Sequence, residues 1–346
     1  MRFCQHNSVT GEHSFETFAH ITSFELSNSG PLNAKTASDK TICLLMEGNP
    51  QFTEDYFAHL VEVFNDSETT VAYSDFEVKS NFQLVDSHIR PPSWSPERFL
   101  STDFLGPVIA VEISKFEYLK TPITRLSIVL ACIENNLKVT HFAEIGYSVP
   151  FESFQQTTSS HSAEVKSFLD RNRPGSRIDR EISTWSFVSN KALAPDLISV
   201  IIPTRGAKKS LTGKPLVIEC VSSLVNQKLG TSKLEILIVF DTDASASYLK
   251  KLKEFESEYV TIKFVDYDPP FNFSSKCNIG AQNASGEVLV FLNDDTLWRN
   301  EDSLLELAGT AMIQGIGAVG AKLFFENNRL QHAGYIYRNN FIGHAY

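Results

Sequence analysis

Residues 286–296 read GEVLVFLNDDT. The apolar run 288–292 is typical of a strand buried on both faces of a parallel sheet, and it stops at Asn293, Asp294 and Asp295. Ligands of open α/β sheets bind beyond the carboxyl ends of the strands. Two adjacent carboxylates repel each other there unless a cation lies between them, and a hard divalent ion shared with substrate phosphates meets that need. The alternative interpretation is a solvated turn, for which Asn-Asp-Asp-Thr is ordinary composition.

The composition is that of a soluble globular protein. The chain has 346 residues, 42% hydrophobic and 21% charged, which is enough for two domains with buried cores. Its net charge of -10 argues against a general nucleic-acid or anionic-membrane surface, so we expect no nucleic-acid partner. Five cysteines without metal-type spacing indicate reduced thiols, and no apolar run approaches the roughly 18 residues of a membrane span. We therefore expect a cytoplasmic protein.

Breaks in the apolar pattern divide the chain into four segments. Residues 1–40 are weakly patterned and predict an irregular arm, and residues 152–196 are polar, contain Arg-Pro-Gly-Ser and predict a linker with one helix at 163–170. Between them, residues 41–151 predict a smaller α/β module. Its expected strands are 42–46, 71–73 and 106–111, and its expected helices are 52–63 and 123–135.

Strands alternate regularly with helices in residues 197–346. The expected strands are 198–202 (ended by Pro203), 234–240, 260–265, 288–292 and 318–325. The expected helices cover 217–225, 248–255, a stretch from Ser274 or Ser275 to Ala284, and 304–312. This alternation predicts a Rossmann-like, doubly wound and mostly parallel sheet.

Three of these strands end in polar residues that a parallel sheet would bring to one edge. They are followed by residues 203–205 (PTR), 241–243 (DTD) and 293–295 (NDD). A strand-end carboxylate such as that of Asp241 commonly accepts a hydrogen bond from a nucleobase or ribose. The first strand is not followed by Gly-x-Gly-x-x-Gly, and the chain has no P-loop motif, so neither a dinucleotide cofactor nor a P-loop site is expected.

The order of motifs resembles family-2 glycosyltransferases, in particular the large bacterial enzymes that build O-antigen and other surface polysaccharides. The motifs that carry the resemblance are 198–205 (ISVIIPTR), 239–241 (VFD), 270–274 (PFNFS), 278–281 (NIGA), 286–296, 317–323 (GAVGAKL), 331–334 (QHAG) and 343–345 (GHA). Together they cover about 197–346.

This resemblance implies a GT-A fold and an inverting transfer, from a UDP- or dTDP-sugar donor to a glycan or lipid-linked glycan acceptor. It also implies Mn²⁺ or Mg²⁺ as cofactor, and leaves open a peripheral association with the inner membrane or with a partner chain. Residues 293–295 match the Asp-x-Asp motif with Asn293 in the first position, so Asp295 is the expected metal ligand and Asp294 a sugar or ribose contact. The other expected nucleotide-sugar contacts are Pro203, Thr204 (through its backbone), Arg205 and Asp241. Thr204 could instead simply cap its strand, and Arg205 could steady a phosphate or pair with a surface carboxylate.

The N-terminal module carries a partial resemblance to the second half of another such domain, on residues 44–49, 73–77 and 94–100. Glu47-Gly48-Asn49 stands where acidic metal ligands are expected, and the nucleotide-binding front half is absent. We therefore expect a degenerate packing or acceptor-side module, in which Asp75 and Glu77 are either turn residues or ligands. An alternative is that residues 41–150 complete the sheet of the second half.

The lesser candidates are weaker. Asn272 and Asn278 are expected to fix a loop and a helix start, Cys277 to be buried, and His332 and His344 to be either structural or close to the diphosphate or acceptor.

No general base is evident. The acidic residues after Asp295 are Glu301, Asp302, Glu306 and Glu326, and none is an obvious base, so we expect poor turnover from this chain alone. Two other classes stay open: a catalytically silent nucleotide- or glycan-binding protein, and a nucleotidyltransferase, for which Gly206-Ala207-Lys208-Lys209 is a thin version of the basic glycine-rich loop.

Overall fold

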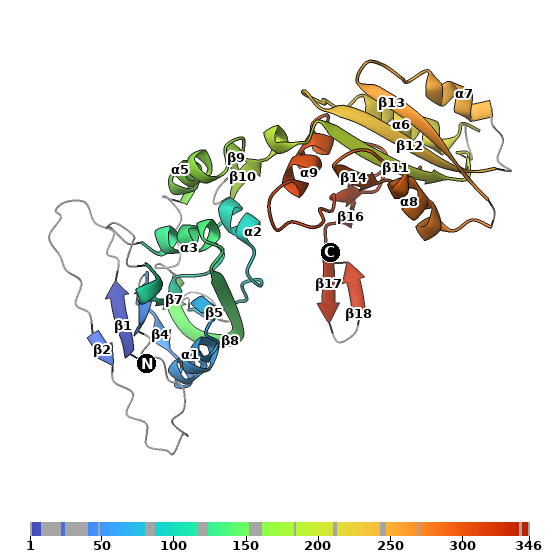
Figure 1. Cartoon of the computed structure of the whole chain (residues 1–346). Coiled ribbons are helices and arrows are strands. Elements are labelled where there is room, and N and C mark those ends of the chain that lie inside the picture. The colour runs from blue at the N-terminus through green and yellow to red at the C-terminus, as the bar shows by residue number, and fades with distance from the viewer. Residues whose placement is uncertain are drawn as a thin grey trace. The chain divides into compact units, whose positions relative to one another are not determined.

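The computed structural model divides the chain into two units, Met1–Val188 and Ser189–Tyr346 (Figure 1). The division falls inside the segment 152–196 that the sequence predicts as a linker, while the predicted domain boundaries themselves stay a prediction. The structure describes residues 2–7, 22–24, 41–47, 49–79, 87–116, 124–151, 161–182, 185–209, 213–242, 247–268, 270–338 and 341–344.

The first unit is built on one mixed sheet, whose described strands run in the order β2-β1-β3-β7-β5-β8-β4, with β6 paired to β5. Parallel pairing joins β1 to β3 and β5 to β8, and the other pairs are antiparallel. The strands are β1 (Arg2–Asn7), β2 (Thr22–Phe24), β3 (Thr41–Met46), β4 (Gln51–Phe52), β5 (Thr69–Lys79), β6 (Ser87–Ile89), β7 (Val108–Glu112) and β8 (Lys138–Pro150).

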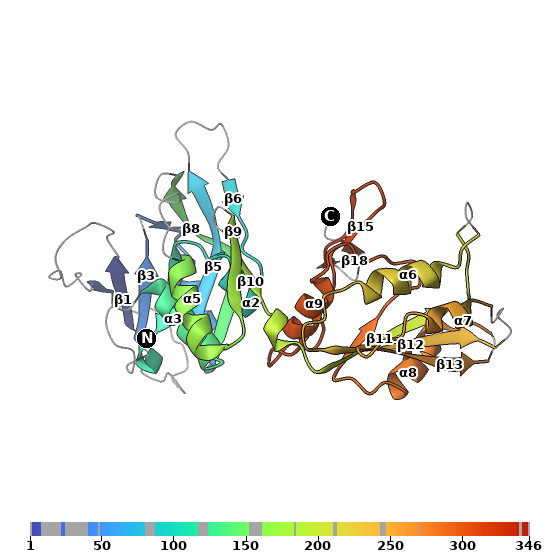
Figure 2. The ribbon, with the colours of Figure 1, turned by 90° about the horizontal axis from the view of Figure 1, so that it is seen from above.

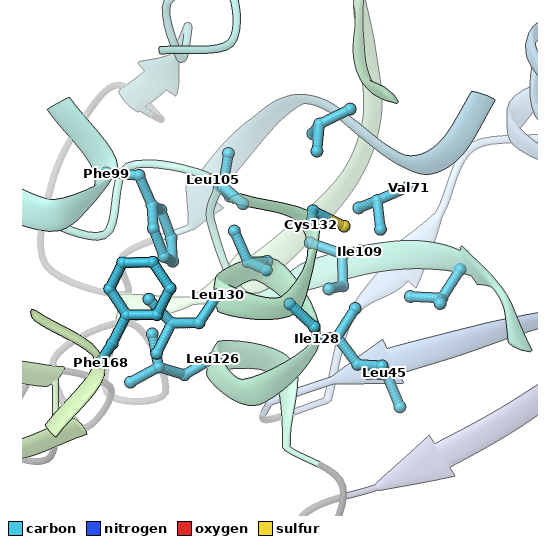
Figure 3. Close-up of a cluster of buried hydrophobic side chains, with 14 of the residues drawn as sticks. Leu45, Val71, Phe99, Leu105, Ile109, Leu126, Ile128, Leu130, Cys132 and Phe168 are labelled. Atoms are coloured by element: carbon cyan, nitrogen blue, oxygen red, sulfur yellow. The ribbon is translucent and has the colours of Figure 1, made fainter. Parts of the chain in front are cut away.

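Both faces of this sheet are covered by helices. Helix α1 (Tyr56–Asn65) covers one face, and α3 (Arg125–Glu134) with α5 (His161–Asn172) covers the other, with the short α2 (Pro96–Ser101) beside them. Successive residues of a strand point to opposite faces, so Val71 belongs to the core under α3 and Ala72 to the core under α1. Figure 3 shows the first of these cores, in which Phe168 of α5 lies beside Leu126 and Leu130 of α3.

Several expectations for this unit are corrected. The described part of residues 1–40 is not irregular, because β1 pairs with β3 and extends the sheet. The strand expected at 71–73 runs from Thr69 to Lys79 because β8 pairs along its whole length. The helix expected from residue 52 begins at Tyr56, since Gln51 and Phe52 pair with β8.

Much of the expected linker is folded. The predicted helix is present as α5, and its Val165, Phe168 and Leu169 are buried in the core of the first unit. Strands β9 (Arg177–Ile182) and β10 (Trp185–Ser189) follow as a two-stranded sheet, and the short 3-10 helix η3 (Lys191–Leu193) opens the second unit.

The second unit contains a fully parallel sheet in the order β13-β12-β11-β14. Its strands are β11 (Leu197–Thr204), β12 (Lys233–Asp241), β13 (Val260–Tyr267) and β14 (Val288–Phe291). The chain moves outward from β11 through β12 to β13 and then returns to the other side of β11. This reversal creates a switch point at the carboxyl ends of β11 and β14, where ligands of such sheets bind. The predicted α/β class with a parallel sheet is confirmed.

Helices cover both faces of this sheet as well (Figures 1 and 2). Helices α6 (Leu216–Val225), α7 (Ser247–Lys253) and α9 (Ser303–Ala311) bury one apolar cluster, and α8 (Phe273–Gln282) lies on the opposite face. The sequence predicted Ser274 or Ser275 as the N-cap residue of α8, and this prediction is wrong. Asn272 caps the helix, because its Oδ1 accepts a hydrogen bond of 3.0 Å from the Ser275 amide.

Pro203 does not end its strand, which continues to Thr204. A proline in a central strand normally loses a ladder hydrogen bond. Here the Ile201 carbonyl accepts from Leu292, so the groups of residue 203, two positions later, point to the same side, past the last residue of β14. The missing N–H of Pro203 therefore costs the ladder nothing.

The edge strand β14 is half exposed, which contradicts the predicted burial on both faces. Leu289 is 39% and Phe291 54% exposed, because no described helix covers that side of this edge strand. The strand expected at 318–325 is also wrong. Only Leu323–Phe324 (β15) is extended, and it pairs with β16 (Leu330–His332) in a hairpin instead of joining the sheet.

The last described strands, β17 (Tyr335–Arg338) and β18 (Phe341–His344), form a second hairpin. Residues 41–150 do not complete the second sheet, since their described strands all belong to the sheet of the first unit.

Gly280 sets how closely α8 approaches the sheet. A methyl group added at this position would lie 2.4 Å from Ile201 Cγ2 and 3.1 Å from Val239 Cγ2. Overpacking of this kind costs about 1–3 kcal/mol, and the better helix propensity of alanine returns about 1 kcal/mol. We expect Gly280→Ala to lower the free energy of unfolding, measured by urea titration of the whole chain. Gly317→Ala is the control, because an added methyl there meets nothing within 4 Å; equal stabilities of the two variants would contradict this close approach.

Candidate nucleotide-binding site

Two strand ends of the second unit are joined by a side-chain hydrogen bond. The Thr204 hydroxyl, at the end of β11, donates to Asp294 Oδ2 over 2.5 Å, and Asp294 lies in the loop after β14. The same hydroxyl accepts a 2.9 Å hydrogen bond from the amide of Gly206. At the switch point, the Thr204 hydroxyl therefore connects the loop after β11 to the loop after β14. Thr204 acts here through its side chain, not only through its backbone.

A buried lysine completes the junction, and the sequence analysis missed it. Lys276, on α8, is fully buried, and its Nζ lies 2.7 Å from Asp241 Oδ1. The same Nζ donates to the carbonyl of Thr204 over 2.6 Å and to that of Val239 over 3.4 Å. Lys276 precedes Gly280 by one helical turn, so both residues face the sheet. A lysine in the sheet-facing register of an amphipathic helix was the available signal.

Asp241 lies at the end of β12 under two cations. Its side chain is 5% exposed; Lys276 contacts one carboxylate oxygen, and Arg205 Nε lies 3.5 Å from the other. The Arg205 side chain is 68% exposed, and its guanidinium carbon lies 5.4 Å from the ring centroid of Phe271. Arg205 therefore lies next to the carboxylate oxygen of Asp241 that Lys276 does not contact.

A pocket of about 270 Å³ opens above this junction. It is lined by Pro203, Phe271, Phe273, Asn293, Asp294 and Asp295. Four of these six residues were predicted, and the two phenylalanines, 40% and 47% exposed, were not. The pocket combines exposed aromatic rings, which can stack on a planar or sugar ring, with carboxylates that can hold a cation.

The two carboxylates differ in their surroundings. Burial and the neighbouring charge of Asp295 raise the pKa of Asp294, although the hydrogen bond from Thr204 and the charge of Lys276 oppose the shift. Asp295 is exposed. In the described part of the chain, no three His, Cys, Asp or Glu side chains lie close enough together to hold a metal ion by themselves. Adjacent hard oxygen ligands nevertheless fit a divalent cation that takes its other ligands from a diphosphate and from water.

A buried tyrosine adjoins the same junction. The ring of Tyr248 lies under Gly206, where an added methyl would come within 2.8 Å of Tyr248 Cε1. Burial, together with the charges of Asp241 and Asp294, raises the pKa of Tyr248 to about 12. Within the described residues its hydroxyl has no hydrogen-bond partner.

A second pocket, of about 320 Å³, lies on the other side of Asp295. Its lining residues are Lys209, Leu216, Glu219, Asp295, Leu297 and Glu326. Lys209 Nζ is 3.8 Å from Glu219 and 3.7 Å from Glu326. Asp295 thus borders both pockets, and Glu219 is an acidic residue near the site that the sequence analysis did not single out.

The other acidic candidates are engaged elsewhere. Glu301 pairs with Lys228 at 2.6 Å, and Asp302 pairs with Lys191 at 3.0 Å. Glu306 accepts hydrogen bonds from the Ser189 hydroxyl and the Asn190 amide, at 2.6 and 3.0 Å, and so ties α9 to the segment before β11.

The lesser candidates lie outside both pockets. Asn278 is exposed on α8, the thiol of Cys277 is buried with its pKa raised by burial, and the ring of His332 packs on Tyr335 with centroids 4.5 Å apart. Asp243 and the side chain of His344 lie outside the described residues.

In the first unit, the position expected for a metal ligand is occupied by a protein cation. Glu47 accepts from Arg125 Nε at 3.3 Å, and the buried Arg125 also pairs with Asp103. Asp75 and Glu77 lie within β5, not in a turn; they pair with His141 at 2.8 Å and His88 at 2.9 Å. Gly48 lies outside the described residues.

Residues 199–335, which contain the junction and both pockets, match the model of Glycosyl transferase family 2. This chain carries a family 2 glycosyl transferase domain. The resemblance seen in the sequence motifs is thereby confirmed.

Two relatives extend the comparison. The O-antigen biosynthesis protein RfbC of Myxococcus xanthus is 31% identical over 159 residues, which are 44% of this chain and 12% of that protein. The uncharacterized protein y4gI of Sinorhizobium fredii is 24% identical over 275 residues, which are 72% of this chain and 29% of that protein. The chain therefore spans less than a third of the length of either relative.

Solved glycosyltransferase structures align with part of the chain. The mannosyltransferase PcManGT from Pyrobaculum calidifontis, in complex with GDP-Man and Mn²⁺, covers 36% of this chain and 34% of its own, with 19% identity and a TM-score of 0.31. TarS 1-349 of S. aureus, in complex with UDP-GlcNAc, covers 37% and 38%, with 20% identity and a TM-score of 0.27. Likeness at these scores carries no argument about the ligands of this chain. Within the described residues, no helix has both the length and the apolarity to cross a bilayer.

The hydrogen bond from Thr204 can be tested through the acidity of Asp294. Because the Thr204 hydroxyl stabilises the carboxylate form, Thr204→Val should raise the pKa of Asp294 further above its ordinary value. Carbon-detected NMR titration of the carboxyl groups measures this shift. Thr242→Val is the control, since the Thr242 hydroxyl donates to Asp268 at the end of the neighbouring strand. An unchanged Asp294 titration in Thr204→Val would mean that the bond is absent in solution.

Proposed function

We propose that the family 2 domain binds a nucleotide sugar, and that the protein transfers the sugar, with inversion, to a growing bacterial surface glycan or its lipid-linked precursor. The observation that carries this proposal is the junction of Thr204, Asp241, Lys276 and Asp294 at the switch point, beneath a pocket that ends in Asp295. The name of the relative RfbC supports the choice of acceptor.

In this proposal the nucleoside lies at the Asp241 end of the pocket. Phe271 offers an exposed ring next to Arg205, and Asp241 Oδ2 accepts from a ribose or base group once Arg205 moves off it. Arg205, exposed and always charged, is then free to contact a phosphate.

The diphosphate lies at the other end of the pocket. Asp295, with Asp294 beside it, would hold Mn²⁺ or Mg²⁺ there. A divalent ion in this place neutralises the charge that grows on the leaving diphosphate. Asp294 is fixed by Thr204, so its carboxylate is oriented before the ligand arrives.

The acceptor would occupy the pocket beyond Asp295. Inversion requires in-line attack by an acceptor hydroxyl and a carboxylate that takes its proton. Glu219 and Glu326 line that pocket, whereas Glu301, Asp302 and Glu306 pair elsewhere. A silent nucleotide-binding protein is the second candidate function, favoured by the ion pairs that both of these glutamates make with Lys209.

Metal-dependent binding is the first test. Calorimetric titration of UDP, dTDP and GDP into the whole chain should show at least one nucleotide that binds about 10-fold more tightly with Mn²⁺ than without it. Asp295→Ala should remove this enhancement. Glu287→Ala, an exposed carboxylate at the opposite end of the same strand, should keep it. Binding that ignores Mn²⁺, or no binding of any of the three nucleotides, would contradict the proposed site.

Variants in the second pocket distinguish a sugar-transferring enzyme from a protein that only binds nucleotides. With the donor that binds best and a panel of lipid-linked acceptors, loss of the base should lower turnover about 100-fold or more while nucleotide affinity stays within about 2-fold. We expect Glu219→Gln or Glu326→Gln to behave in this way. Glu301→Gln, whose carboxylate pairs with Lys228 at the surface, is the matched control. A parent chain that binds donors but never transfers a sugar would favour the silent protein.

A further inference from the structure

Lys276 carries its charge in the protein interior, where removing a charge from water has a high free-energy cost. Its side chain is fully buried in the second unit, on the face of α8 that lies against β11 and β12. An unpaired ammonium buried in this way would lose its proton or unfold the site. It is kept because its Nζ lies 2.7 Å from the carboxylate of Asp241 and donates to the carbonyls of Thr204 and Val239.

Packing alone does not explain a lysine at this position. Gly280 already lets α8 lie against the sheet, and Asn272 caps the first turn of the helix. Replacing a buried ion pair by apolar residues of similar size is often neutral or even stabilising. A charge that the fold does not need points to a role in the site.

Two of the residues that Lys276 contacts have roles in the proposed site. Asp241 marks the nucleoside end. The Thr204 carbonyl accepts a hydrogen bond from Lys276, and the Thr204 hydroxyl donates one to Asp294, which marks the metal end. The Lys276 ammonium therefore connects Asp241 to Asp294 through a single intermediate residue, Thr204.

The same ammonium lies against the aromatic wall of the pocket. Its Nζ is 4.9 Å from the ring centroid of Phe271 and 5.3 Å from that of Tyr267. Phe271 lines the pocket, so a ligand that moves this ring also changes the surroundings of Lys276.

We propose that Lys276 is a positioning residue that couples nucleoside binding at Asp241 to metal and diphosphate binding at Asp294 and Asp295. The proposal rests on the proposed function, because it assumes that the pocket takes a nucleoside diphosphate. Lys276 itself touches no ligand; it holds the groups that do. With the ammonium in place, ordering of either end favours the productive arrangement of the other.

The coupling is measured as the enhancement by Mn²⁺, that is, the Kd of UDP without Mn²⁺ divided by its Kd with Mn²⁺, with dTDP or GDP used instead if the parent prefers it. Lys276→Met should lower this ratio about 5-fold or more. Lys263→Met is the matched control, because Lys263 pairs with the buried Glu235 near the amino-terminal end of the same sheet, and it should leave the ratio unchanged. A purely structural lysine would lower stability in both variants and change the ratio in neither.

A double-mutant cycle completes the test. Asp241→Asn and Lys276→Met should each weaken binding in the presence of Mn²⁺ by about 10-fold, and the double variant should be little weaker than either single one. The double variant also carries no uncompensated buried charge, so it stays usable if Lys276→Met alone fails to fold. In that case a Mn²⁺ enhancement reduced to the same extent in Asp241→Asn and in the double variant supports the coupling, and an enhancement equal to the parent's in both contradicts it.

The outcomes separate the two proposals. If the parent chain binds none of the nucleotides, the proposed function fails before Lys276 is tested. If the parent binds with Mn²⁺ enhancement and Lys276→Met changes the Kd equally with and without Mn²⁺, the lysine serves one end only and the coupling is wrong. Additive losses in the cycle would overturn it in the same way.

Discussion

The buried ammonium of Lys276 is the constraint on which the second unit's site depends. Because Lys276 is fully buried, its charge must be neutralised and its donors must find acceptors within the protein. Asp241 supplies the charge, and the carbonyls of Thr204 and Val239 supply the remaining acceptors. The ends of β11 and β12 are thereby held in one geometry, and Thr204 carries it on to the loop after β14.

This arrangement is helped by the close approach of α8 to the sheet at Gly280. Gly280 has no side chain that would separate the helix from Ile201. One helical turn earlier, the Lys276 side chain reaches the ends of β11 and β12. The exposed residues of the site then lie next to the buried and paired side chains of Lys276, Asp241 and Thr204. Arg205, Phe271 and Asp295 are exposed, whereas Asp241 and Asp294 are held by Lys276 and Thr204. Acceptors that are already oriented lower the entropy that binding a flexible, highly charged ligand costs.

The sequence predicted the parts of this site that depend on the order of strands. Apolar runs that stop at Pro203, Asp241 and Asn293 must end at one edge once the strands are parallel, and the structure places them there. Lys276 was not predicted, because FSSKCNIG reads locally as an ordinary helix start and the lysine is buried only through the close approach at Gly280.

Burial and pairing between distant elements were the weak points of the sequence analysis. The composition of 288–292 suggests burial on both faces, but the exposure of Leu289 and Phe291 depends on which elements lie beside β14. Residues 318–325 look like a strand, yet most of them find no partner among the described strands. In the first unit, Glu47 could not be told from a metal ligand until Arg125, distant in sequence, was seen to pair with it.

A crystal structure of the whole chain with Mn²⁺ and a nucleoside diphosphate tests the central claim most directly. The account predicts an anomalous manganese peak between Asp295 and the diphosphate, with Lys276 still paired to Asp241 and Arg205 displaced from it. A manganese peak at any other cluster of carboxylates, or a nucleotide bound away from Pro203 and Phe271, would contradict it.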